Sequence, residues 1–391
     1  MKQGWEYKKL GEIGNIVTGS TPSTKDESNY SPREYCFVKP SDLPSQGIVL
    51  IEETEYYVSR KGLSKSRVLP TGSVLVSCIG SIGKIGILTK EACSNQQINA
   101  IIPKNDIDSK FIAYSIYAYR FLLESIANAP VVPIINKTDF SKIQIPLPPK
   151  STQLSIVSEL DKINELIRLK KEQLKDYDNL AQSIFYEMFG DPVENEKGWE
   201  VKKLSSLFKV SSSKRIMQEE WTKEGVPFLK VSDIVSLIKH GKVSPSTFIS
   251  KLKFKKLEEA KMVPTVGDIL ITSRGTLGLC YIIKTDDKFY FQDGMVTWLS
   301  ENTGDIIPIY ITYVFSNNHF LEVLAGRANK STVSYISIKQ ISKKEITVPP
   351  LPLQHLFAQR IEQIERQKSA VQKSITDLET LLASRMQYWF E

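Results

Sequence analysis

The chain contains the same unit twice. The segment Gly4-Trp5-Glu6-Tyr7-Lys8-Lys9-Leu10 returns 194 residues later as Gly198-Trp199-Glu200-Val201-Lys202-Lys203-Leu204. An apolar run that ends in a glycine turn occupies residues 75–83 and again 270–278, and residues 153–190 are matched by 354–391. Two copies in 391 residues predict a fold with internal pseudo-twofold symmetry. Such a fold suits a ligand that is itself roughly twofold, and duplex DNA is the leading candidate.

The composition is that of a globular protein with a buried core, since 41% of the residues are hydrophobic and 24% are charged. No apolar run approaches the ~18 residues of a membrane-spanning helix, and the first residues lack an apolar signal core. None of the four cysteines is matched by a cysteine in the other copy, and no C-x-x-C spacing occurs. This argues against a repeated zinc site or disulfide framework, and we expect a reduced, cytoplasmic protein.

The charge is basic and unevenly divided. The net charge is +7; residues 1–195 hold 23 Lys and Arg against 23 Asp and Glu, and residues 196–391 hold the remaining 28 against 21. Excess Lys and Arg favour a polyanion partner, because their binding to phosphates releases condensed counterions. The signal is weak by itself, since many ordinary proteins have a pI near 8.9.

Each copy is expected to begin with a strand-rich part and to end with a long helix. Residues 69–77 and 263–272 predict a turn followed by a buried strand, and helices are expected around 109–127 and 309–325. Proline runs then mark the domain ends, because proline cannot donate to a sheet ladder. The expected division is a first domain at 1–150, a long helix with linker at 151–195, a second domain at 196–352 and a second long helix at 353–391.

The two long helices carry a narrow apolar seam with heptad spacing. In the first helix the seam positions are Ile156, Leu160, Ile163, Ile167, Leu174, Tyr177, Ala181, Ile184 and Met188, interrupted only by Lys170. In the second they are Phe357, Ile361, Ile364, Val371, Ile375, Leu378, Leu382 and Trp389, with Lys368 and Arg385 as exceptions. A seam so long and narrow favours packing of each helix on the other over packing on its own domain alone. We therefore predict an antiparallel pair.

These features resemble the specificity subunit of type I restriction-modification systems. The resemblance rests on four elements present in both copies. The first is the Gly-Trp-Glu-x-Lys-Lys-Leu segment, and the second is the Lys-x-Ser-Asp segment at 39–42 and 230–233. The third is the glycine turn at 80–83 and 275–278, which is followed by a polar segment at 94–100 and 291–295. The fourth is the Pro-Leu-Pro segment with a nearby Gln before each long helix. The order of these elements and their duplication cover essentially the whole chain. Gln292-Asp293-Gly294 departs from Gln96-Gln97-Ile98 of the first copy, which makes the transfer of individual DNA contacts unsafe.

The resemblance implies an α+β fold in which two mixed α/β target-recognition domains are separated by two long antiparallel coiled-coil helices. Each domain would read one half of a bipartite site in double-stranded DNA. The helices would set the unread spacer and dock two adenine-N6 methyltransferase subunits, and motor-nuclease subunits would complete the complex. The specificity subunit would have no catalytic activity and no cofactor of its own, with S-adenosylmethionine, ATP and Mg²⁺ on the partner subunits.

The motifs of the chain argue against enzyme chemistry of its own. The three histidines have no counterpart in the first copy, and no Asn-Pro-Pro-aromatic or Asp-Pro-Pro-Tyr motif for a flipped base is present. Gly80-Ser81-Ile82-Gly83-Lys84 fails the spacing of a phosphate loop, and Asn136-Lys137-Thr138-Asp139 is a coincidental match to a guanine-reading motif. Two alternatives stay open: a DNA-modifying enzyme with an unrecognised site, and a coiled-coil scaffold that binds only proteins.

The candidate DNA contacts lie in loops and turns. The glycine turns are either plain turns between buried strands or turns packed against DNA. Arg274 is the sharpest candidate, because arginine pairs with guanine through two hydrogen bonds, although a salt bridge within its domain is equally open. Asp42 and Asp233 are expected to cap a turn or helix, and the five lysines of 251–261 to form a solvated helix face. The predicted contacts are Lys39, Ser41, Ser81, Lys84, Gln96, Gln97, Lys137, Lys230, Ser232, Arg274, Thr276, Gln292, Arg327, Lys330 and Ser331.

Overall fold

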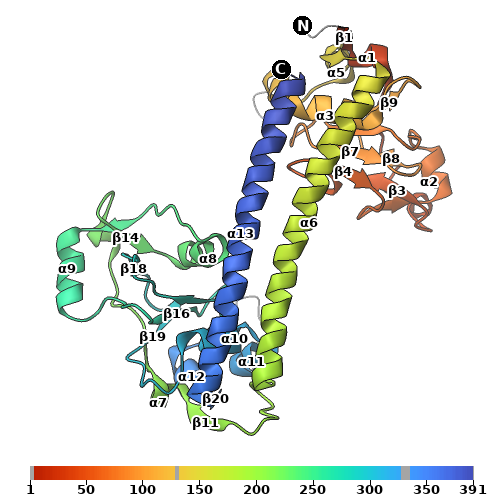
Figure 1. The fold of residues 1–391 in the computed structure, drawn as a ribbon. Coiled ribbons are helices and arrows are strands. Elements are labelled where there is room, and N and C mark those ends of the chain that lie inside the picture. The colour runs from red at the N-terminus through yellow and green to blue at the C-terminus, as the bar shows by residue number, and fades with distance from the viewer. Residues whose placement is uncertain (1–3, 128–131, 327–334, 391) are drawn as a thin grey trace. The chain divides into compact units, whose positions relative to one another are not determined.

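The computed structural model describes residues 4–127, 132–326 and 335–390. The chain divides into two compact units (Figure 1). Unit 1 comprises residues 1–172 and 372–391, and unit 2 comprises residues 173–371. Each unit therefore contains one copy of the globular part and one half of each long helix. Among the described residues, no helix is both long and apolar enough to cross a membrane.

Unit 1 is built on a five-stranded sheet of order β2-β9-β6-β7-β4 and a three-stranded sheet of order β5-β3-β8. The strands of the larger sheet are antiparallel except for the parallel pair β4 and β7. The strand bounds are β1 (Glu6–Lys9), β2 (Gly14–Thr18), β3 (Tyr35–Val38), β4 (Ile48–Ile51), β5 (Tyr57–Val58), β6 (Val74–Ser77), β7 (Ile85–Leu88), β8 (Cys93–Ser94), β9 (Ile98–Pro103) and β10 (Gln144–Leu147). The short β1 pairs with β10 in a separate ribbon.

The helices of unit 1 pack on both sheets. They are α1 (Leu10–Ile13), α2 (Arg60–Ser64), α3 (Ser109–Ala118), α4 (Arg120–Ile126) and α5 (Lys137–Lys142), with 3₁₀ turns η1 (Glu27–Asn29) and η2 (Pro40–Asp42). Every residue of β6 and β7 is buried, as expected of a central strand with both faces covered. The single helix predicted at 109–127 is divided at Tyr119, whose backbone leaves helical geometry (φ −91°, ψ 15°).

Unit 2 repeats this plan with local changes. Its sheets have the orders β12-β19-β16-β17 and β13-β15-β14-β18, and β11 pairs with β20 as β1 does with β10. The strand bounds are β11 (Glu200–Lys203), β12 (Lys209–Ser211), β13 (Trp221–Thr222), β14 (Val226–Leu229), β15 (Phe248–Ile249), β16 (Ile269–Thr272), β17 (Cys280–Ile282), β18 (Tyr290–Phe291), β19 (Val296–Ser300) and β20 (Glu345–Val348). Where unit 1 has the edge strand β4, unit 2 has helix α8.

The helices of unit 2 are α7 (Leu204–Leu207), α8 (Val231–His240), α9 (Lys251–Glu259), α10 (Pro308–Ser316), α11 (Asn318–Ala325) and α12 (Ile338–Lys343), with the 3₁₀ turn η3 (Gln218–Glu220). The helix predicted at 309–325 is also two helices, because Asn317 starts a new one by accepting from the Phe320 amide at 2.7 Å. Helix α9 buries Phe254 and Leu257 and exposes most of its lysines. The five-lysine stretch is thus largely a solvated face, as predicted.

The long helices α6 (Lys150–Phe189) and α13 (Leu351–Phe390) begin one and two residues before the predicted segments 151–195 and 353–391. Gly190, in the left-handed conformation at φ +76°, ends α6. The helices make contact in both units with opposite directions. In unit 1 Lys171 is 2.9 Å from Glu379, and in unit 2 the Phe185 and Phe357 rings are 5.7 Å apart. The predicted antiparallel pair of helices between mixed α/β parts is confirmed.

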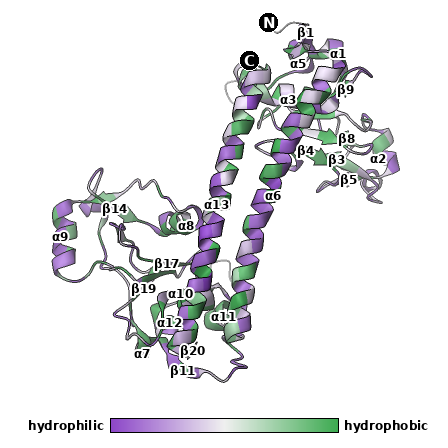
Figure 2. Cartoon of the chain, viewed as in Figure 1, coloured by the Kyte–Doolittle hydropathy of each residue, from purple (hydrophilic) through white to green (hydrophobic). Residues whose placement is uncertain are grey.

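Two of the charged interruptions of the seam, Lys368 and Arg385, have partners on the facing helix. Lys368 is 2.8 Å from Asp178 of α6 and 2.8 Å from Glu365 of its own helix. Burial lowers the pKa of the Lys368 ammonium, but the two carboxylates together raise it by more, so the net shift is upward. Arg385 binds Glu159 through two nitrogens, and the Trp389 indole donates to the same carboxylate at 3.0 Å. Figure 2 shows the resulting mixture of hydrophilic and hydrophobic residues along α6 and α13. The heptad pattern underestimated the apolar contact, since Phe185 and Phe189 are buried in the aromatic core of unit 2.

A buried glutamine anchors the start of each long helix. Gln153 accepts from the Asp108 amide and donates to the Pro148 carbonyl, both at 3.0 Å. Gln354 accepts from the Ile307 amide at 2.9 Å and donates to the Pro349 carbonyl at 2.7 Å. The glutamines near the Pro-Leu-Pro segments are therefore structural, because each joins a long helix to the N-cap residue of α3 or α10.

The tryptophan of the repeated Gly-Trp-Glu segment closes the other end of a long helix. Trp199 donates from its indole to the Phe189 carbonyl at 2.8 Å, which satisfies one of the last carbonyls of α6. Trp5 packs in the unit 1 cluster that contains Phe390 of α13. Each copy of the segment thus meets the end of the helix from the other copy.

Candidate nucleic-acid interface

In unit 1, loops from distant parts of the sequence meet at one end of the larger sheet. The Ser20 amide donates to the Ser94 carbonyl at 2.8 Å, and the Cys78 amide donates to the Gln97 carbonyl at 2.8 Å. Lys84 Nζ donates to the Pro40 carbonyl at 3.2 Å, and the Ile135 amide donates to the Cys78 carbonyl. We call this surface edge 1, which consists of residues 19–21, 39–42, 78–84, 95–97 and 133–137.

Unit 2 builds the same surface from the equivalent loops. The Gln292 amide donates to the Leu229 carbonyl, and the Ser273 amide donates to the Met295 carbonyl, each at 2.9 Å. Arg274 forms an isolated antiparallel bridge with Tyr335. Edge 2 consists of residues 212–215, 230–233, 273–278, 292–295 and 335–337. All the predicted contacts that fall on described residues lie on one of these two edges.

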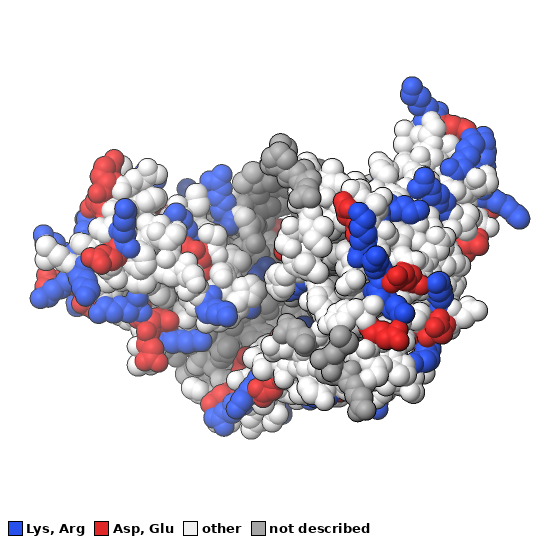
Figure 3. All heavy atoms as spheres, turned by 90° about the horizontal axis from the view of Figure 1, so that it is seen from above, with Lys and Arg blue, Asp and Glu red and all other residues white. Residues whose placement is uncertain are grey.

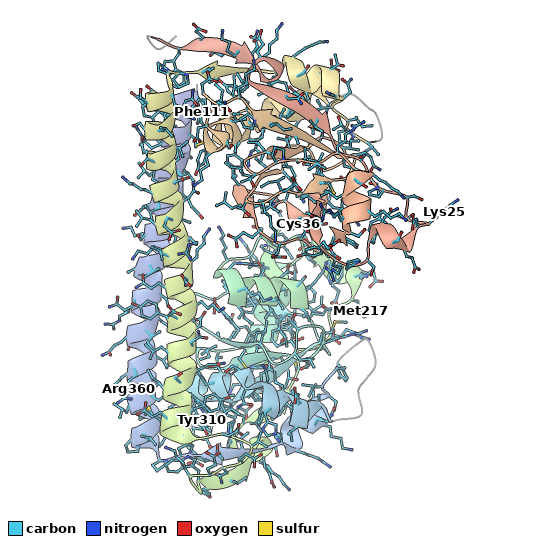
Figure 4. All side chains as sticks on the ribbon, turned by 90° about the vertical axis from the view of Figure 1, so that its right-hand side faces the viewer. Lys25, Cys36, Phe111, Met217, Tyr310 and Arg360 are labelled. Atoms are coloured by element: carbon cyan, nitrogen blue, oxygen red, sulfur yellow. The ribbon has the colours of Figure 1, made fainter. Side chains whose placement is uncertain are left out.

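Both edges lie away from the helical core of their own unit. Figure 4 shows Phe111 beside the long helices and Lys25, near edge 1, on the opposite side of unit 1. In unit 2 the same view shows Tyr310 beside the helices and Met217, near edge 2, far from them. Loops on a scaffold of buried strands are the usual place for binding residues.

The two glycine turns have the same internal geometry. Gly80 and Gly83 have φ of +76° and +79°, and Gly275 and Gly278 have +77° and +75°. The hydroxyl of the last residue of the preceding strand closes each turn. It accepts from the Lys84 amide at 2.9 Å in unit 1 and from the Leu279 amide at 3.0 Å in unit 2. The turns are therefore rigid connections between buried strands that also hold their tips at the edge.

The tips of the glycine turns are exposed. Ser81, Arg274 and Thr276 are exposed, and Lys84 is half-buried because it reaches back to the Pro40 carbonyl. In the part of the chain that the structure describes, Arg274 has no carboxylate partner. The salt bridge left open as an alternative is thus absent from this part.

The Lys-x-Ser-Asp segments confirm the predicted role of their aspartates. Asp42 accepts from the Lys39 amide at 2.7 Å, and Asp233 accepts from the Lys230 amide at 2.9 Å. The lysine ammonium groups lie over aromatic rings of their own units, at 3.0 Å from the Tyr56 centroid for Lys39 and 5.1 Å from the Trp221 centroid for Lys230. Ser41 and Ser232 are exposed beside them.

The amides of the polar loops divide into structural and exposed groups. Asn99, considered beside Gln96 and Gln97, is buried and accepts from the Thr18 hydroxyl at 2.7 Å. Gln97 accepts from Asn95 at 2.9 Å and is half-buried. Gln96 is exposed and accepts from the Thr21 hydroxyl at 2.6 Å. Gln292 is half-buried at edge 2.

The remaining predicted residues are located as follows. Lys137 is exposed at the first turn of α5, where Asn136 caps the helix by accepting from the Asp139 amide at 2.9 Å. Asn136-Lys137-Thr138-Asp139 is therefore a capped helix start. Arg327, Lys330 and Ser331 lie outside the described residues.

Sequence reasoning missed a basic patch next to edge 1. It consists of the exposed residues Lys25, Arg60, Lys61, Lys65 and Arg67, of which Lys61 and Lys65 are each 3.1 Å from Asp26. Figure 3 shows many Lys and Arg side chains on the projection at its upper right. Arg67 donates to the Thr18 carbonyl at 2.5 Å, which attaches the patch to the end of β2. The signal in the sequence was four basic residues in the eight of 60–67.

The carboxylates on the two edges are held by neighbouring groups, since Asp42 and Asp233 accept from backbone amides and Asp293 accepts from Arg215. The described residues contain no cluster of three His, Cys, Asp or Glu side chains suited to a metal ion. Burial raises the pKa of the Cys78 thiol beside edge 1 to about 12, so the thiol is neutral at physiological pH and a poor nucleophile. The edges instead offer exposed amide, hydroxyl and basic groups, which suit hydrogen bonding to bases and phosphates.

Comparisons with known proteins agree with this arrangement. The family described as Type I restriction modification DNA specificity domain matches residues 2–176 and again 196–380. The chain is 26% identical over 398 residues to the type I restriction enzyme MjaIX specificity subunit of Methanocaldococcus jannaschii, with 96% of this chain and 90% of that protein covered.

Two solved structures have a similar fold. The first belongs to a structure of the type I R-M system that concerns its complex assembly and conformational transition. It has a TM-score of 0.63 at 18% identity, and the match covers 99% of this chain and 97% of that chain. The second is the type I restriction-modification S subunit from M. genitalium, with a TM-score of 0.54 at 14% identity and coverage of 99% and 96%. The resemblance found in the sequence is confirmed, and the chain belongs to the type I restriction-modification DNA specificity family.

Proposed function

We propose that this chain directs a type I restriction-modification complex to a bipartite site in double-stranded DNA. Edge 1 reads one half-site and edge 2 reads the other. The observation that carries this proposal is the repetition of one rigid loop framework with different side chains at its tips. Ser81 of unit 1 corresponds to Thr276 of unit 2, and Gln96 of unit 1 corresponds to Asp293 of unit 2. Equal frameworks with unequal tips suit two different half-sites.

The chain itself supplies recognition, and its partners supply chemistry. Two adenine-N6 methyltransferase subunits dock on the paired helices, and motor-nuclease subunits complete the assembly. S-adenosylmethionine, ATP and Mg²⁺ bind to these partners. The exposed faces of α6 and α13 support the docking role, because Leu166, Leu169, Leu180 and Leu381 are 45–48% exposed. Apolar side chains exposed on a paired helix are available for a protein partner.

A methylome tests the proposal directly. The chain is expressed with its neighbouring methyltransferase gene in a methylation-free host, beside a culture that lacks this chain. Single-molecule sequencing then maps N6-methyladenine. The expected result is a bipartite motif with a fixed unread spacer that occurs only when the chain is present. Identical methylation in both cultures, with both proteins expressed, would favour the scaffold alternative. Methyl transfer by the purified chain alone would favour the enzyme alternative.

The spacer function of the helices has its own test. Deleting residues 167–173 and 368–374 removes one heptad from the middle of each helix and keeps the seam in phase. At ~1.5 Å per residue the deletion shortens each helix by about 10 Å, which equals about three base pairs at 3.4 Å each. A spacer shortened by about three base pairs, with both half-sites unchanged, is expected. Altered half-site sequences would contradict the spacer role.

A further inference from the structure

The two edges contain a matched pair of side-chain contacts. In each unit the segment after the first sheet strand runs beside the loop that follows β8 or β18. The Ser20 amide donates to the Ser94 carbonyl at 2.8 Å, and the Ser213 hydroxyl donates to the Phe291 carbonyl at 2.7 Å. The strand registers place Ser94 and Phe291 at equivalent positions, opposite Val38 and Leu229. One or two residues further along each segment, a side chain of the first segment donates a hydrogen bond to a side chain of the second. The pairs are Thr21 with Gln96 in unit 1 and Arg215 with Asp293 in unit 2.

The chemistry of this contact differs between the units. In unit 2 Arg215 Nε donates to Asp293 Oδ2 at 3.1 Å. In unit 1 Thr21 Oγ1 donates to Gln96 Oε1 at 2.6 Å. The framework is thus constant, whereas the group presented to solvent is a guanidinium in one unit and a carboxamide in the other.

Arg215 is oriented by its partner but still exposed. Its side chain is 73% exposed, whereas that of Asp293 is 24% exposed. The carboxylate holds the guanidinium through Nε, and in the described part of the chain the two Nη groups have no partner. An exposed ion pair contributes about 0–1 kcal/mol to stability, so stability does not account for the arrangement. The two Nη groups match the O6 and N7 acceptors of guanine in the major groove.

The surface beside Arg215 suits a nucleic-acid base. A hollow of about 380 Å³ lies there, lined among others by Met217, Trp221, Phe228 and Gln292. The Lys230 ammonium is 5.1 Å from the centroid of Trp221, one of these lining residues, and Glu219 and Asp293 also line the hollow. Apolar and amide groups contact base edges, and the ammonium complements the phosphates.

We infer that Arg215, held by Asp293, reads a guanine in the half-site of unit 2, and that Gln96, held by Thr21, reads an adenine in the other half-site. Within the described residues, Gln96 has its Nε2 donors and the second lone pair of Oε1 available for the N7 and N6 groups of adenine. This inference rests on the proposed function. It adds the residues that make the two half-sites different.

The experiment uses the chain with its methyltransferase and a plasmid library in which each position of both half-sites is randomised. The wild-type chain is compared with Arg215→Lys, Arg215→Ala and Gln96→Ala, and Lys223→Ala, which lies outside edge 2, is the control for loss of an exposed charge in unit 2. Arg215→Lys is the decisive variant, because lysine keeps the charge for a phosphate but loses the planar fork. The fraction of methylated plasmids is read for each base at each position.

Both Arg215 variants are expected to reduce the preference for guanine at one position of one half-site from about 10–100-fold to near unity. The other half-site stays intact, which also shows that these variants fold. Gln96→Ala is expected to relax one adenine position in the other half-site only. Asp293→Asn, which keeps an oxygen acceptor but loses the charge, gives a smaller loss than Arg215→Ala.

Three outcomes separate this inference from the proposed function. An unchanged guanine preference in Arg215→Lys, or equal weakening of all sites in Arg215→Ala, would overturn the inference. Relaxation by Lys223→Ala as strong as that by Arg215→Ala would also overturn it. A wild-type chain that gives no bipartite motif would instead overturn the proposed function itself.

Discussion

Replacing Gln354 with methionine should destabilise unit 2 by about 3 kcal/mol. The side chain is fully buried and makes three hydrogen bonds, to the Ile307 amide at 2.9 Å and to the carbonyls of Asp305 and Pro349 at 3.1 and 2.7 Å. Methionine fills similar volume, so the cost is the loss of hydrogen bonds rather than a cavity. Each costs about 0.5–1.5 kcal/mol, and more where the group left behind is buried.

The equivalent glutamine of unit 1 provides an internal comparison. Gln153 makes two of these bonds, to the Asp108 amide and the Pro148 carbonyl. Gln153→Met should therefore cost about 2 kcal/mol, roughly 1 kcal/mol less than Gln354→Met. The exposed Gln363, two to three turns further along α13, is the control. Gln363→Met should change stability by less than about 0.5 kcal/mol.

Hydrogen exchange resolves the two units separately. Amides of α10 report on unit 2 and amides of α3 on unit 1, at exchange conditions where protection measures the free energy of opening. About 3 kcal/mol corresponds to a loss of protection of roughly 100-fold in α10. A loss below about fivefold for Gln354→Met, or a larger effect for Gln153→Met than for Gln354→Met, would refute this accounting of buried hydrogen bonds.

Three further predictions concern the turns, the helix pair and the basic patch. In thermal unfolding, Gly278→Ala should destabilise unit 2 by about 2–3 kcal/mol, whereas Gly83→Ala should destabilise unit 1 by about 1–2 kcal/mol. Both glycines have positive φ, which an alanine rarely adopts. The larger cost at 278 arises because a Cβ there would lie 2.5 Å from Leu321 of α11. The Arg385 hydrogen bond lowers the pKa of Glu159 below its ordinary 4.5. The stability that this pair supplies is therefore complete above pH 4.5 and is lost as the pH falls below it. The melting temperatures of wild type and Arg385→Ala should differ at pH 7 and converge below pH 4.5. Arg67→Ala should weaken DNA binding equally for all sequences and reduce the slope of log K against log salt by about 0.9, whereas a change of motif would contradict a phosphate contact.

The sequence predicted the architecture well because its strongest signals are repeated. Duplication reported two units, and heptad spacing reported an antiparallel helix pair whose charged interruptions at Lys368 and Arg385 proved to have partners on the facing helix. The breaks at Tyr119 and Asn317 were missed, because apolar periodicity continues across them and the capping interactions are local.

The candidate site was predictable in position but not in pairing. The loops expected to contact DNA do meet at one edge of each unit, since they follow adjacent strands. The Arg215–Asp293 contact joins residues 78 positions apart and leaves no periodic trace in the sequence. The Lys39 and Lys230 ammonium groups illustrate the same limit, because their aromatic neighbours come from separate strands or loops.

The composition of the two units has a consequence for synthesis. Unit 2 is one continuous stretch, residues 173–371, whereas unit 1 needs residues 372–391 to cover Phe111 and Ile156 with Met386 and Phe390. The ribosome therefore delivers all of unit 2 before the first-made unit can close. Until then the nascent first unit exposes an apolar surface, so the second half of the chain is the first to become a finished folding unit.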